Sequence, residues 1–331
     1  MSEYQRIIGE ELIIEHFTRA VTHNKISHSY ILNGESGMGK KTLARYFSKA
    51  IQCEKQDGIP CLECTSCKQA LSGNHPDIVW VTHEKETVIA VDEIREQLVS
   101  DILIKPYKSK HKIYIVDEAQ KMNVATQNAV LKTIEEPPEY GVIIFLTTNA
   151  DMFLQTILSR CIRLSLKPLN KQVIKEHLMR ECGVPDYKAE VMASFSGGNM
   201  GKAIRLASSE NFNEMKDEIV HLLKYIDTME VYEMVLASKA ATAYKMNIDD
   251  YIDMFTLWFR DVLLYKASMD VDELLFKDEV SIIKDQASKA SYQGIEKILG
   301  ALDKVKVRLK ANVNFELTME LLFMTIKDNL K

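Results

Sequence analysis

The chain has 331 residues, of which 46% are hydrophobic and 27% charged, and it carries a formal net charge of −5. This is the balance of a globular protein, and at this length we expect two or three domains. The net negative charge argues against a protein that coats nucleic acid through bulk charge, although it leaves a local basic surface open.

The N-terminal residues 1–6 are polar and lack the apolar core of a signal peptide. Apolar runs along the chain stay shorter than the roughly 18 residues of a membrane span. We therefore expect a cytoplasmic protein with no membrane partner.

The first elements form a helix, a strand, a glycine-rich turn and a second helix. Apolar residues recur at helical spacing from Leu12 to Val21, and the strand is Ser29-Tyr30-Ile31-Leu32. The turn is Gly34-Glu35-Ser36-Gly37-Met38-Gly39-Lys40-Lys41, which has the strand, loop and helix context of a P-loop. Such glycines let backbone N–H groups surround phosphate oxygens, while the lysine at the helix start reaches the outer phosphates.

The residue after the P-loop lysine departs from the pattern. A serine or threonine is expected there to hold magnesium, but the chain has Lys41, with Thr42 one position late. One residue turns a helix by about 100°, so the Thr42 hydroxyl is not expected to face the metal. We interpret Gly34, Gly37, Gly39, Lys40, Lys41 and Thr42 as a weak or vestigial nucleotide site, and whether it binds nucleotide stays open.

Four of the six cysteines crowd into one stretch, Cys53, Cys61, Cys64 and Cys67. In a cytosolic chain such clustering favours a metal over disulfides. Four thiolates in a turn-rich loop can surround a zinc ion tetrahedrally with no position open for water, which predicts a structural site; the alternative is reduced cysteines that bind nothing. His75 lies nearby and is interpreted as a turn residue.

Strands and helices alternate through the next hundred residues. Predicted strands are Asp77 to Val81, Thr87 to Ala90, Ile113 to Val116, Val142 to Leu146 and Ile162 to Leu166, and Asp92 is predicted to cap a helix whose apolar face is Ile94, Leu98 and Ile102. A helix from about Val124 to Glu135 should stop at Pro137-Pro138. Alternation of this kind predicts a parallel, doubly wound sheet.

Polar groups follow three of these strands. Asp117-Glu118 ends a buried strand, where an aspartate binds magnesium and a glutamate polarises the attacking water; an ordinary helix cap is the alternative. Thr147-Thr148-Asn149 either places a polar side chain against a terminal phosphate or is an ordinary loop start. Ser159-Arg160-Cys161 follows a predicted short helix, Phe153 to Leu158, and taken alone Arg160 is a surface arginine.

Beyond Pro168 only helical periodicity is found. A small helical unit reaches about Ser209, and the clearest helices after it are Ile248 to Ala267, Ile295 to Leu309 and Phe315 to Ile326. We predict an α/β P-loop domain with a parallel sheet at 1–167 that contains the four-cysteine module 53–67, a small helical lid domain at 168–209, and an all-helical domain at 210–331.

In this order, these motifs resemble the bacterial clamp-loader subunits of the AAA+ superfamily, and the resemblance covers the whole chain. Asn128 to Pro138 is similar to the family's helix before the sensor strand, while Trp258-Phe259-Arg260-Asp261 and Asn312-Val313-Asn314 are similar to its C-terminal collar domain. The collar would hold a ring of subunits together.

Two branches of that family share this outline, the ATPase subunits (tau/gamma) and the delta-prime subunits of DNA polymerase III. Lys41 favours the delta-prime branch, as does Gly201, which stands where ATPase subunits carry a sensor arginine. The end of the sequence just after the collar points the same way. Lys40 and the intact Asp117-Glu118 favour nucleotide binding.

The resemblance implies a stator rather than a motor. The protein would join a pentamer with tau/gamma and delta subunits and load the sliding clamp (beta) on primed DNA, contacting primer-template DNA through the complex. Arg160, flanked by Ser159 and Cys161, would act as an arginine finger in a neighbouring subunit's ATP site. We expect no independent ATPase activity from this subunit of the DNA polymerase III holoenzyme. The alternatives are a tau/gamma-like ATP-hydrolysing motor and a zinc-dependent nucleic-acid-binding module with a vestigial P-loop.

Overall fold

The computed structural model describes residues 7–85, 87–208, 211–311 and 313–330. Residues 1–6 and Asn312, both used in the sequence analysis, lie outside these ranges. The chain divides into two compact units: the first comprises residues 1–174 and 198–202, the second 175–197 and 203–331. Among the described helices, none is both long and apolar enough to cross a membrane.

The first unit is built on a five-stranded sheet in the order β2-β3-β4-β1-β5. All pairings are parallel, so the carboxyl ends of the strands meet at one edge. The strands are β1 (Ser29–Asn33), β2 (Ile78–Val81), β3 (Lys112–Val116), β4 (Gly141–Thr147) and β5 (Ile162–Ser165). The predicted parallel sheet is confirmed.

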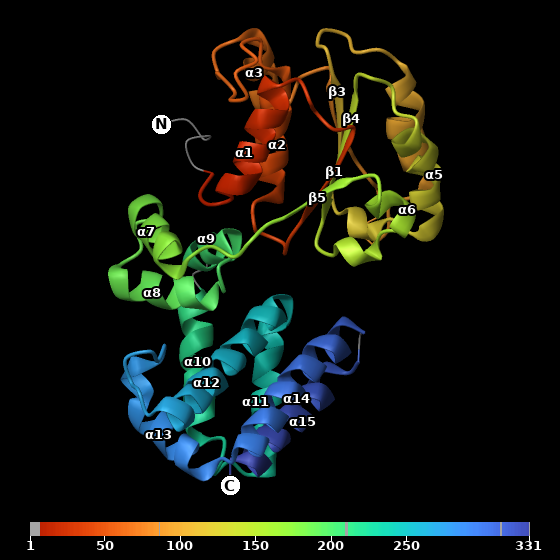
Figure 1. Cartoon of the computed structure of the whole chain (residues 1–331). Coiled ribbons are helices and arrows are strands. Elements are labelled where there is room, and N and C mark those ends of the chain that lie inside the picture. The colour runs from red at the N-terminus through yellow and green to blue at the C-terminus, as the bar shows by residue number, and fades with distance from the viewer. Residues whose placement is uncertain (1–6, 86, 209–210, 312, 331) are drawn as a thin grey trace. The chain divides into compact units, whose positions relative to one another are not determined.

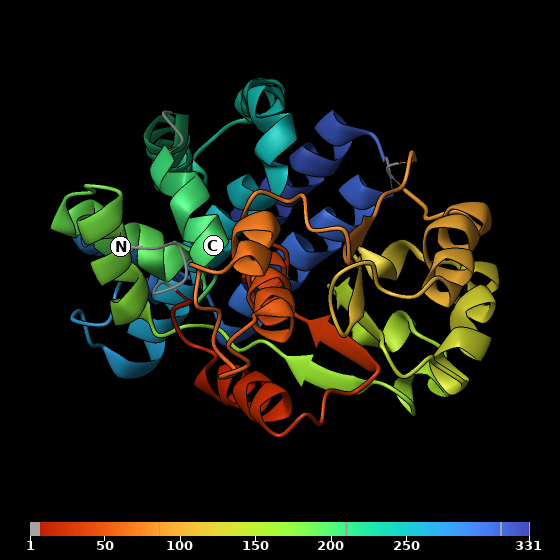
Figure 2. The ribbon, with the colours of Figure 1, turned by 90° about the horizontal axis from the view of Figure 1, so that it is seen from above.

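Helices cover both faces of this sheet, as Figures 1 and 2 show from two directions. On one face, α1 and α2 pack Phe17 and Phe47 against Tyr30 of β1, and the two phenylalanine rings are stacked with centroids 3.8 Å apart. On the other face, Ile134 and Ile157 lie in a second buried cluster. The helices of this unit are α1 (Glu11–Thr22), α2 (Lys40–Gln52), α3 (Thr65–Leu71), α4 (Val91–Ile94), α5 (Val124–Glu135) and α6 (Gln155–Leu158).

The local sequence explains how α5 begins and ends. The Asn123 side chain accepts a hydrogen bond from the Thr126 backbone N–H at 2.9 Å, which satisfies one of the unpaired donors of the first turn. The helix stops at Glu135, because Pro137 and Pro138 disfavour helical backbone in the residues before them. The predicted bounds of this helix are confirmed.

Two local predictions were wrong. Thr87 to Ala90 contains only an isolated bridge, between Ile89 and Met122. Asp92 is inside the first turn of α4: the N-cap is Ala90, whose backbone N–H is bound by the Glu93 carboxylate at 2.7 Å. The apolar face predicted at Ile94, Leu98 and Ile102 is buried as expected, although the segment after Ile94 forms a π-helical turn at Arg95–Ser100 and a 3-10 turn at Asp101–Leu103.

The predicted helix from Phe153 to Leu158 is also shorter than expected. It forms as α6 only from Gln155, because Phe153 and Leu154 are extended after a 3-10 turn at Ala150–Met152.

The second unit is helical. Its longest helix, α12, buries Trp258 and Phe259, and α15 packs Phe323 against Phe255 of α12. The predicted C-terminal helices are confirmed within a few residues. The helices from the end of the sheet onward are α7 (Lys171–Glu181), α8 (Asp186–Phe195), α9 (Met200–Ser208), α10 (Asn211–Tyr225), α11 (Val231–Ala240), α12 (Ile248–Ser268), α13 (Val280–Lys289), α14 (Tyr292–Lys310) and α15 (Phe315–Asn329).

Polar bonds connect three helices inside this unit. The Trp258 indole N–H donates to the Gln286 side chain at 2.8 Å, and Gln286 in turn donates to the Leu223 carbonyl at 2.8 Å. The buried Asp261 accepts from the backbone N–H groups of Leu275 and Phe276. Trp258, Phe259 and Asp261 of this motif therefore lie in the core of the helical unit, while Arg260 is exposed.

Candidate functional site

A cavity of about 390 Å³ lies at the carboxyl edge of the sheet. It is there because β1, β3 and β4 all end at this edge and each is followed by polar residues. The lining residues are Ser36, Gly37, Gly39, Lys40, Lys41, Thr42, Asp117, Glu118, Gln120, Leu146 and Thr148. The structure thus brings the predicted loop and acidic residues together around one space.

The glycine-rich loop depends on left-handed backbone at two positions. Gly37 has φ 91° and Gly39 has φ 96°, values that side chains disfavour, and α2 begins directly after Gly39. The Lys40 ammonium donates to the carbonyl oxygens of Gly34 and Glu35, which holds the side chain across the loop. Burial is the largest influence on Lys40 and lowers its pKa.

Lys41 occupies the place where a magnesium ion would bind. Its Nζ lies 2.6 Å from Oδ2 of Asp117, and the Lys41 side chain is 61% exposed whereas that of Asp117 is 21% exposed. In a P-loop site the metal lies between the residue after the lysine and the acid at the strand end. The residues of this chain therefore do not fit magnesium in the usual way, because an ammonium group already neutralises the carboxylate.

Glu118, the candidate water-polarising residue, is also engaged. Its Oε2 lies 2.7 Å from the Lys121 ammonium and 3.4 Å from Nε2 of His83. The hydrogen bond from Lys121 is the main reason that the pKa of Glu118 is lowered. Glu118 has φ 51°, the left-handed region that a glutamate rarely adopts. The carboxylate is ionised but is directed towards a lysine and a histidine.

The segment Gly198–Lys202 lies against the loop within the first unit. Asn199 donates its side-chain amide to the Ser36 carbonyl at 2.8 Å, and the Gly201 N–H donates to the Gly37 carbonyl at 3.0 Å. A Cβ on Gly201 would lie 2.5 Å from the Gly37 carbonyl oxygen and 2.7 Å from its Cα. Any side chain at position 201, an arginine included, would push into the P-loop backbone.

Thr148 and Asn149, which follow β4, make different contacts. Thr148 lines the cavity, and its backbone N–H donates to the Gln120 side chain at 3.1 Å. Asn149 instead accepts from the Asp151 N–H at 3.0 Å and caps the following turn. Of the two roles weighed for this segment, the loop-start role describes Asn149, while Thr148 faces the site.

Arg160 lies outside the cavity lining, two residues after the end of α6. Its Nη2 is 3.1 Å from Oε1 of Glu135, and its Nη1 donates to the Thr156 carbonyl at 3.1 Å and to Ser159 Oγ at 3.3 Å. The guanidinium is 42% exposed, so it is held in place while remaining accessible to another molecule. The neighbouring Cys161 is partly buried against the core of this unit, and burial raises the pKa of its thiol to about 12.

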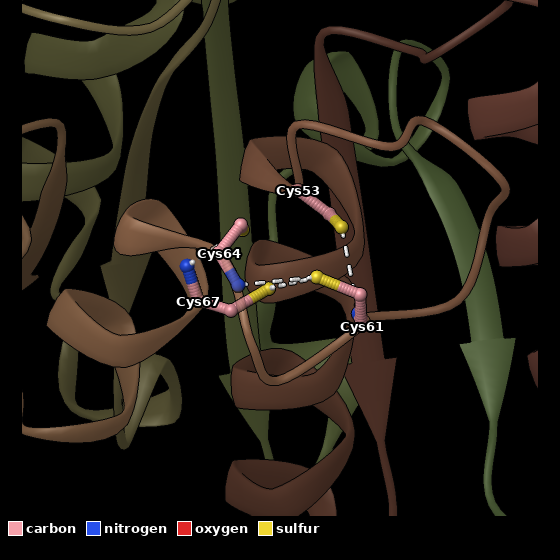
Figure 3. Close-up of side chains that lie close together, drawn as sticks. All are labelled: Cys53, Cys61, Cys64 and Cys67. Atoms are coloured by element: carbon pink, nitrogen blue, oxygen red, sulfur yellow. Dashed lines mark hydrogen bonds between the residues drawn. The ribbon is translucent and has the colours of Figure 1, made fainter.

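The four clustered cysteines converge, and their Sγ atoms all lie within 4.8 Å of one another. Figure 3 shows the sulfur atoms of Cys53, Cys61 and Cys67 turned towards each other. The Cys61 and Cys67 sulfurs are 4.0 Å apart, close to the separation of about 3.8 Å for thiolates around a tetrahedral ion with 2.3 Å bonds. The cluster can bind a metal ion.

The thiols of this cluster differ in pKa: hydrogen bonds from backbone N–H groups lower that of Cys61, whereas burial raises those of Cys53 and Cys67. The N–H groups of Cys61, Cys64 and Cys67 point at the sulfurs of Cys53, Cys61 and Cys64 respectively, each at 3.4 Å. The bond from the Cys64 N–H is the largest influence on Cys61 and contributes to lowering its thiol pKa to about 6. Gly58 allows the loop to close, since a Cβ there would lie 2.6 Å from the Thr18 carbonyl oxygen.

His75 connects the cysteine loop to the sheet rather than joining the cluster. Its Nδ1 accepts from the Asp77 backbone N–H at 3.1 Å, so Nε2 carries the proton and donates to Ser66 Oγ at 2.8 Å. Burial is the largest influence and lowers the pKa of this imidazole. The interpretation as a turn residue agrees with its place between α3 and β2.

Two sequence profiles match the chain. "DNA polymerase III, delta subunit" matches residues 9–170, and "DNA polymerase III, delta subunit, C terminal" matches residues 212–327. Together they cover both the sheet unit and the helical region. The chain belongs to the DNA polymerase III delta-subunit family. Its members include clamp-loader delta′ proteins, and this assignment confirms the resemblance found in the sequence.

Curated relatives fall in both expected branches. DNA polymerase III subunit delta′ of Bacillus subtilis is 26% identical, with 93% of each chain covered, and the delta′ subunit of Pseudomonas aeruginosa is 28% identical over 90% of this chain and 91% of its own. Subunit tau of Bacillus subtilis is 27% identical, but the match spans 58% of its length.

A solved gamma-subunit-related protein of Thermotoga maritima aligns over 96% of this delta-family chain and 99% of its own, at 18% identity with a TM-score of 0.47.

Sequence reasoning missed several partners around these sites. Lys121 and His83 contact Glu118, Gln120 accepts from the Thr148 backbone N–H, and Glu135 pairs with Arg160. Gln120 and Lys121 lie within three residues of Glu118, so their place after the strand was a usable signal. Glu135 lies at the end of a different helix, and no spacing in the sequence indicates that it meets Arg160.

Proposed function

We propose that this chain acts in a clamp loader as a delta′-type stator, a subunit that completes a neighbour's ATP site without turning over ATP itself. Full-length similarity to delta′ subunits at 93% mutual coverage supports the branch. The observation that carries the proposal is the 2.6 Å ion pair between Lys41 and Asp117, because it occupies the place of the magnesium on which ATP hydrolysis depends.

Two further features support an inactive site of its own. Glu118 is paired with Lys121 and is not free to orient a water molecule. Gly201 contacts the P-loop backbone, so position 201 supplies no cation to a terminal phosphate. Each feature removes one component that phosphoryl transfer needs.

In this proposal, Arg160 is the residue that reaches into the ATP site of the neighbouring subunit. A half-exposed guanidinium held by Glu135 and the Thr156 carbonyl is ordered enough to be aimed and exposed enough to reach a phosphate. There it would stabilise transition-state charge in the ATP site of an adjacent tau/gamma subunit. Ser159 positions it through its hydroxyl, while Cys161 packs, partly buried, against the core below the turn.

The partners of the assembled complex follow from this role. They are the tau/gamma ATPase subunits, the delta subunit and the beta sliding clamp, with primer-template DNA contacted through the complex. The C-terminal helices would supply the collar that joins the subunits. The four-cysteine cluster would hold a structural zinc ion, because its four donors leave no position open for a water molecule.

ATP turnover by the purified chain tests the stator role. We expect wild-type protein with magnesium and primed DNA to show no more turnover than the Lys40→Ala variant measured beside it. Robust hydrolysis that Lys40→Ala abolishes would refute the proposal.

That result would support the second candidate function, a tau/gamma-like motor. The observation in its favour is that Lys40 and Glu118 both line the cavity, together with the similarity to subunit tau.

A further inference from the structure

The cavity at the P-loop retains the parts that bind phosphate even though it lacks a place for magnesium. Gly37 and Gly39 shape the loop, and the Lys40 ammonium lies across it with two of its three donors on loop carbonyls. Lys41 and Thr42 add a second cation and a hydroxyl to the same lining. These groups match the oxygen atoms of a polyphosphate.

A metal ion at Asp117 would conflict with Lys41. Magnesium binds carboxylate oxygens at about 2.0–2.1 Å, and here an ammonium nitrogen lies 2.6 Å from Asp117 Oδ2. A divalent cation on that oxygen would be almost in contact with a positive charge, so one would have to leave. Lys41 is covalently tethered to the helix, so its charge is present without binding an ion from solution, whereas magnesium would have to shed water first.

We propose that this loop is a magnesium-independent site for a nucleoside di- or triphosphate, in which the Lys41 ammonium takes the place of the metal ion. Lys40 contacts the outer phosphates, and Lys41, held by Asp117, neutralises the side of the phosphate chain that faces the acidic residues. The bound nucleotide would persist, a consequence that rests on the proposed lack of turnover, and would hold the loop against Asn199 and Gly201.

Titration calorimetry of the full chain tests this directly. ADP and ATP are each titrated into wild-type protein in excess EDTA and again in excess magnesium. We expect saturable binding in both conditions, with dissociation constants that agree within about twofold, a difference below 0.5 kcal/mol. Lys40→Ala should abolish binding in both.

The decisive variant is Lys41→Thr, which restores the hydroxyl residue. It should bind at least about tenfold more tightly with magnesium than with EDTA. Lys41→Met should weaken binding in EDTA, since it removes the charge that takes the place of the metal ion, and magnesium should restore part of it through the freed Asp117 carboxylate. Lys105→Thr, in an exposed loop outside the cavity, is the matched control and should bind like wild type. Circular dichroism and melting curves establish that each variant is folded.

Two results would overturn the proposal. Wild-type protein that binds neither nucleotide in either condition has no such site, and wild-type binding that needs magnesium shows that Lys41 does not replace the ion. The first result leaves the proposed stator function standing, whereas the second removes the ion pair as its support; ATP turnover by the purified chain then decides that function separately.

Discussion

Arg160 and Glu135 form an ion pair, 3.1 Å between Nη2 and Oε1, that joins the turn after α6 to the last residue of α5. Both side chains are 42% exposed, and a pair this exposed contributes about 0–1 kcal/mol. Such a contact orients the guanidinium but is weak enough to break readily. A contact of this strength would let Arg160 leave the Glu135 carboxylate for a phosphate, as its proposed role requires.

Glu135→Gln tests this relationship. Removing the negative charge frees Arg160 for the neighbour's phosphate, so ATP turnover of the reconstituted clamp loader should rise about twofold to fivefold, the range set by a pair worth up to 1 kcal/mol. Glu136→Gln, at the exposed residue next in the chain, should leave turnover unchanged. A fall in turnover with Glu135→Gln would mean that the carboxylate positions the finger in the active state.

The four-cysteine cluster predicts a zinc requirement. Cys64→Ser should lose the metal while keeping α3, because serine replaces the Cys64 side chain as the cap that accepts from the Cys67 N–H. Structural zinc contributes on the order of 10 kcal/mol in small modules, so the first unit should melt at lower temperature. Metal analysis by mass spectrometry checks the loss, and the exposed Cys182→Ser is the control. Unchanged zinc content in Cys64→Ser would refute the assignment.

Gly201 is predicted to tolerate no side chain. Gly201→Ala places a Cβ 2.5 Å from the Gly37 carbonyl oxygen and should destabilise the protein by about 1–3 kcal/mol or displace the loop. Gly300→Ala in α14 is the matched control, because its Cβ meets nothing within 4 Å; it should stabilise the helix by up to about 1 kcal/mol. Urea unfolding measures both. Equal effects from the two substitutions would contradict the close approach.

Asp77 makes part of the first unit's stability dependent on pH. Burial alone would raise the pKa of this carboxyl, but hydrogen bonds from the backbone N–H groups of Lys108, Tyr107 and Ser109 outweigh it and lower the pKa below its usual range. A carboxylate with a lowered folded pKa stabilises the protein above the unfolded pKa of about 3.9, and this contribution is lost as pH falls through the folded value.

Asp77→Asn should therefore cost about 1–3 kcal/mol near neutral pH, and the gap from wild type should shrink in acid below about pH 4. Urea titrations at several pH values measure it, with the exposed Asp57→Asn as control. If the difference in unfolding free energy between wild type and Asp77→Asn stays constant into acid, the loss of stability comes from the shape of the side chain rather than its charge.

The sheet and the cavity were accessible from sequence because their signals are local. Continuous apolar runs marked the buried strands β1, β3 and β4, and parallel pairing then required the loop at Gly37 and the acid at Asp117 to share one edge. A wrong prediction arose where more than one nearby residue could be the N-cap of a helix. Asp92 has the side chain of a good N-cap, yet α4 begins one residue earlier, with Ala90 as the N-cap and its N–H bound by Glu93.

Contacts between distant segments were beyond sequence reasoning. The pairs Lys41 with Asp117 and Arg160 with Glu135 join residues from different elements, and only the packing of the sheet and helices brings them together. The same holds for Gly201: its departure from the ATPase pattern was visible in the sequence, but the contact with Gly37 that excludes a side chain was not.

The central claim is that this chain completes a neighbour's active site. Its most direct test is ATP turnover by tau/gamma and delta reconstituted with this chain, wild type against Arg160→Ala, in the presence of clamp and primed DNA. We predict a loss that approaches about 10³-fold at the affected site while the complex stays assembled, as size-exclusion chromatography would verify. An unaltered rate in an intact complex would contradict the claim.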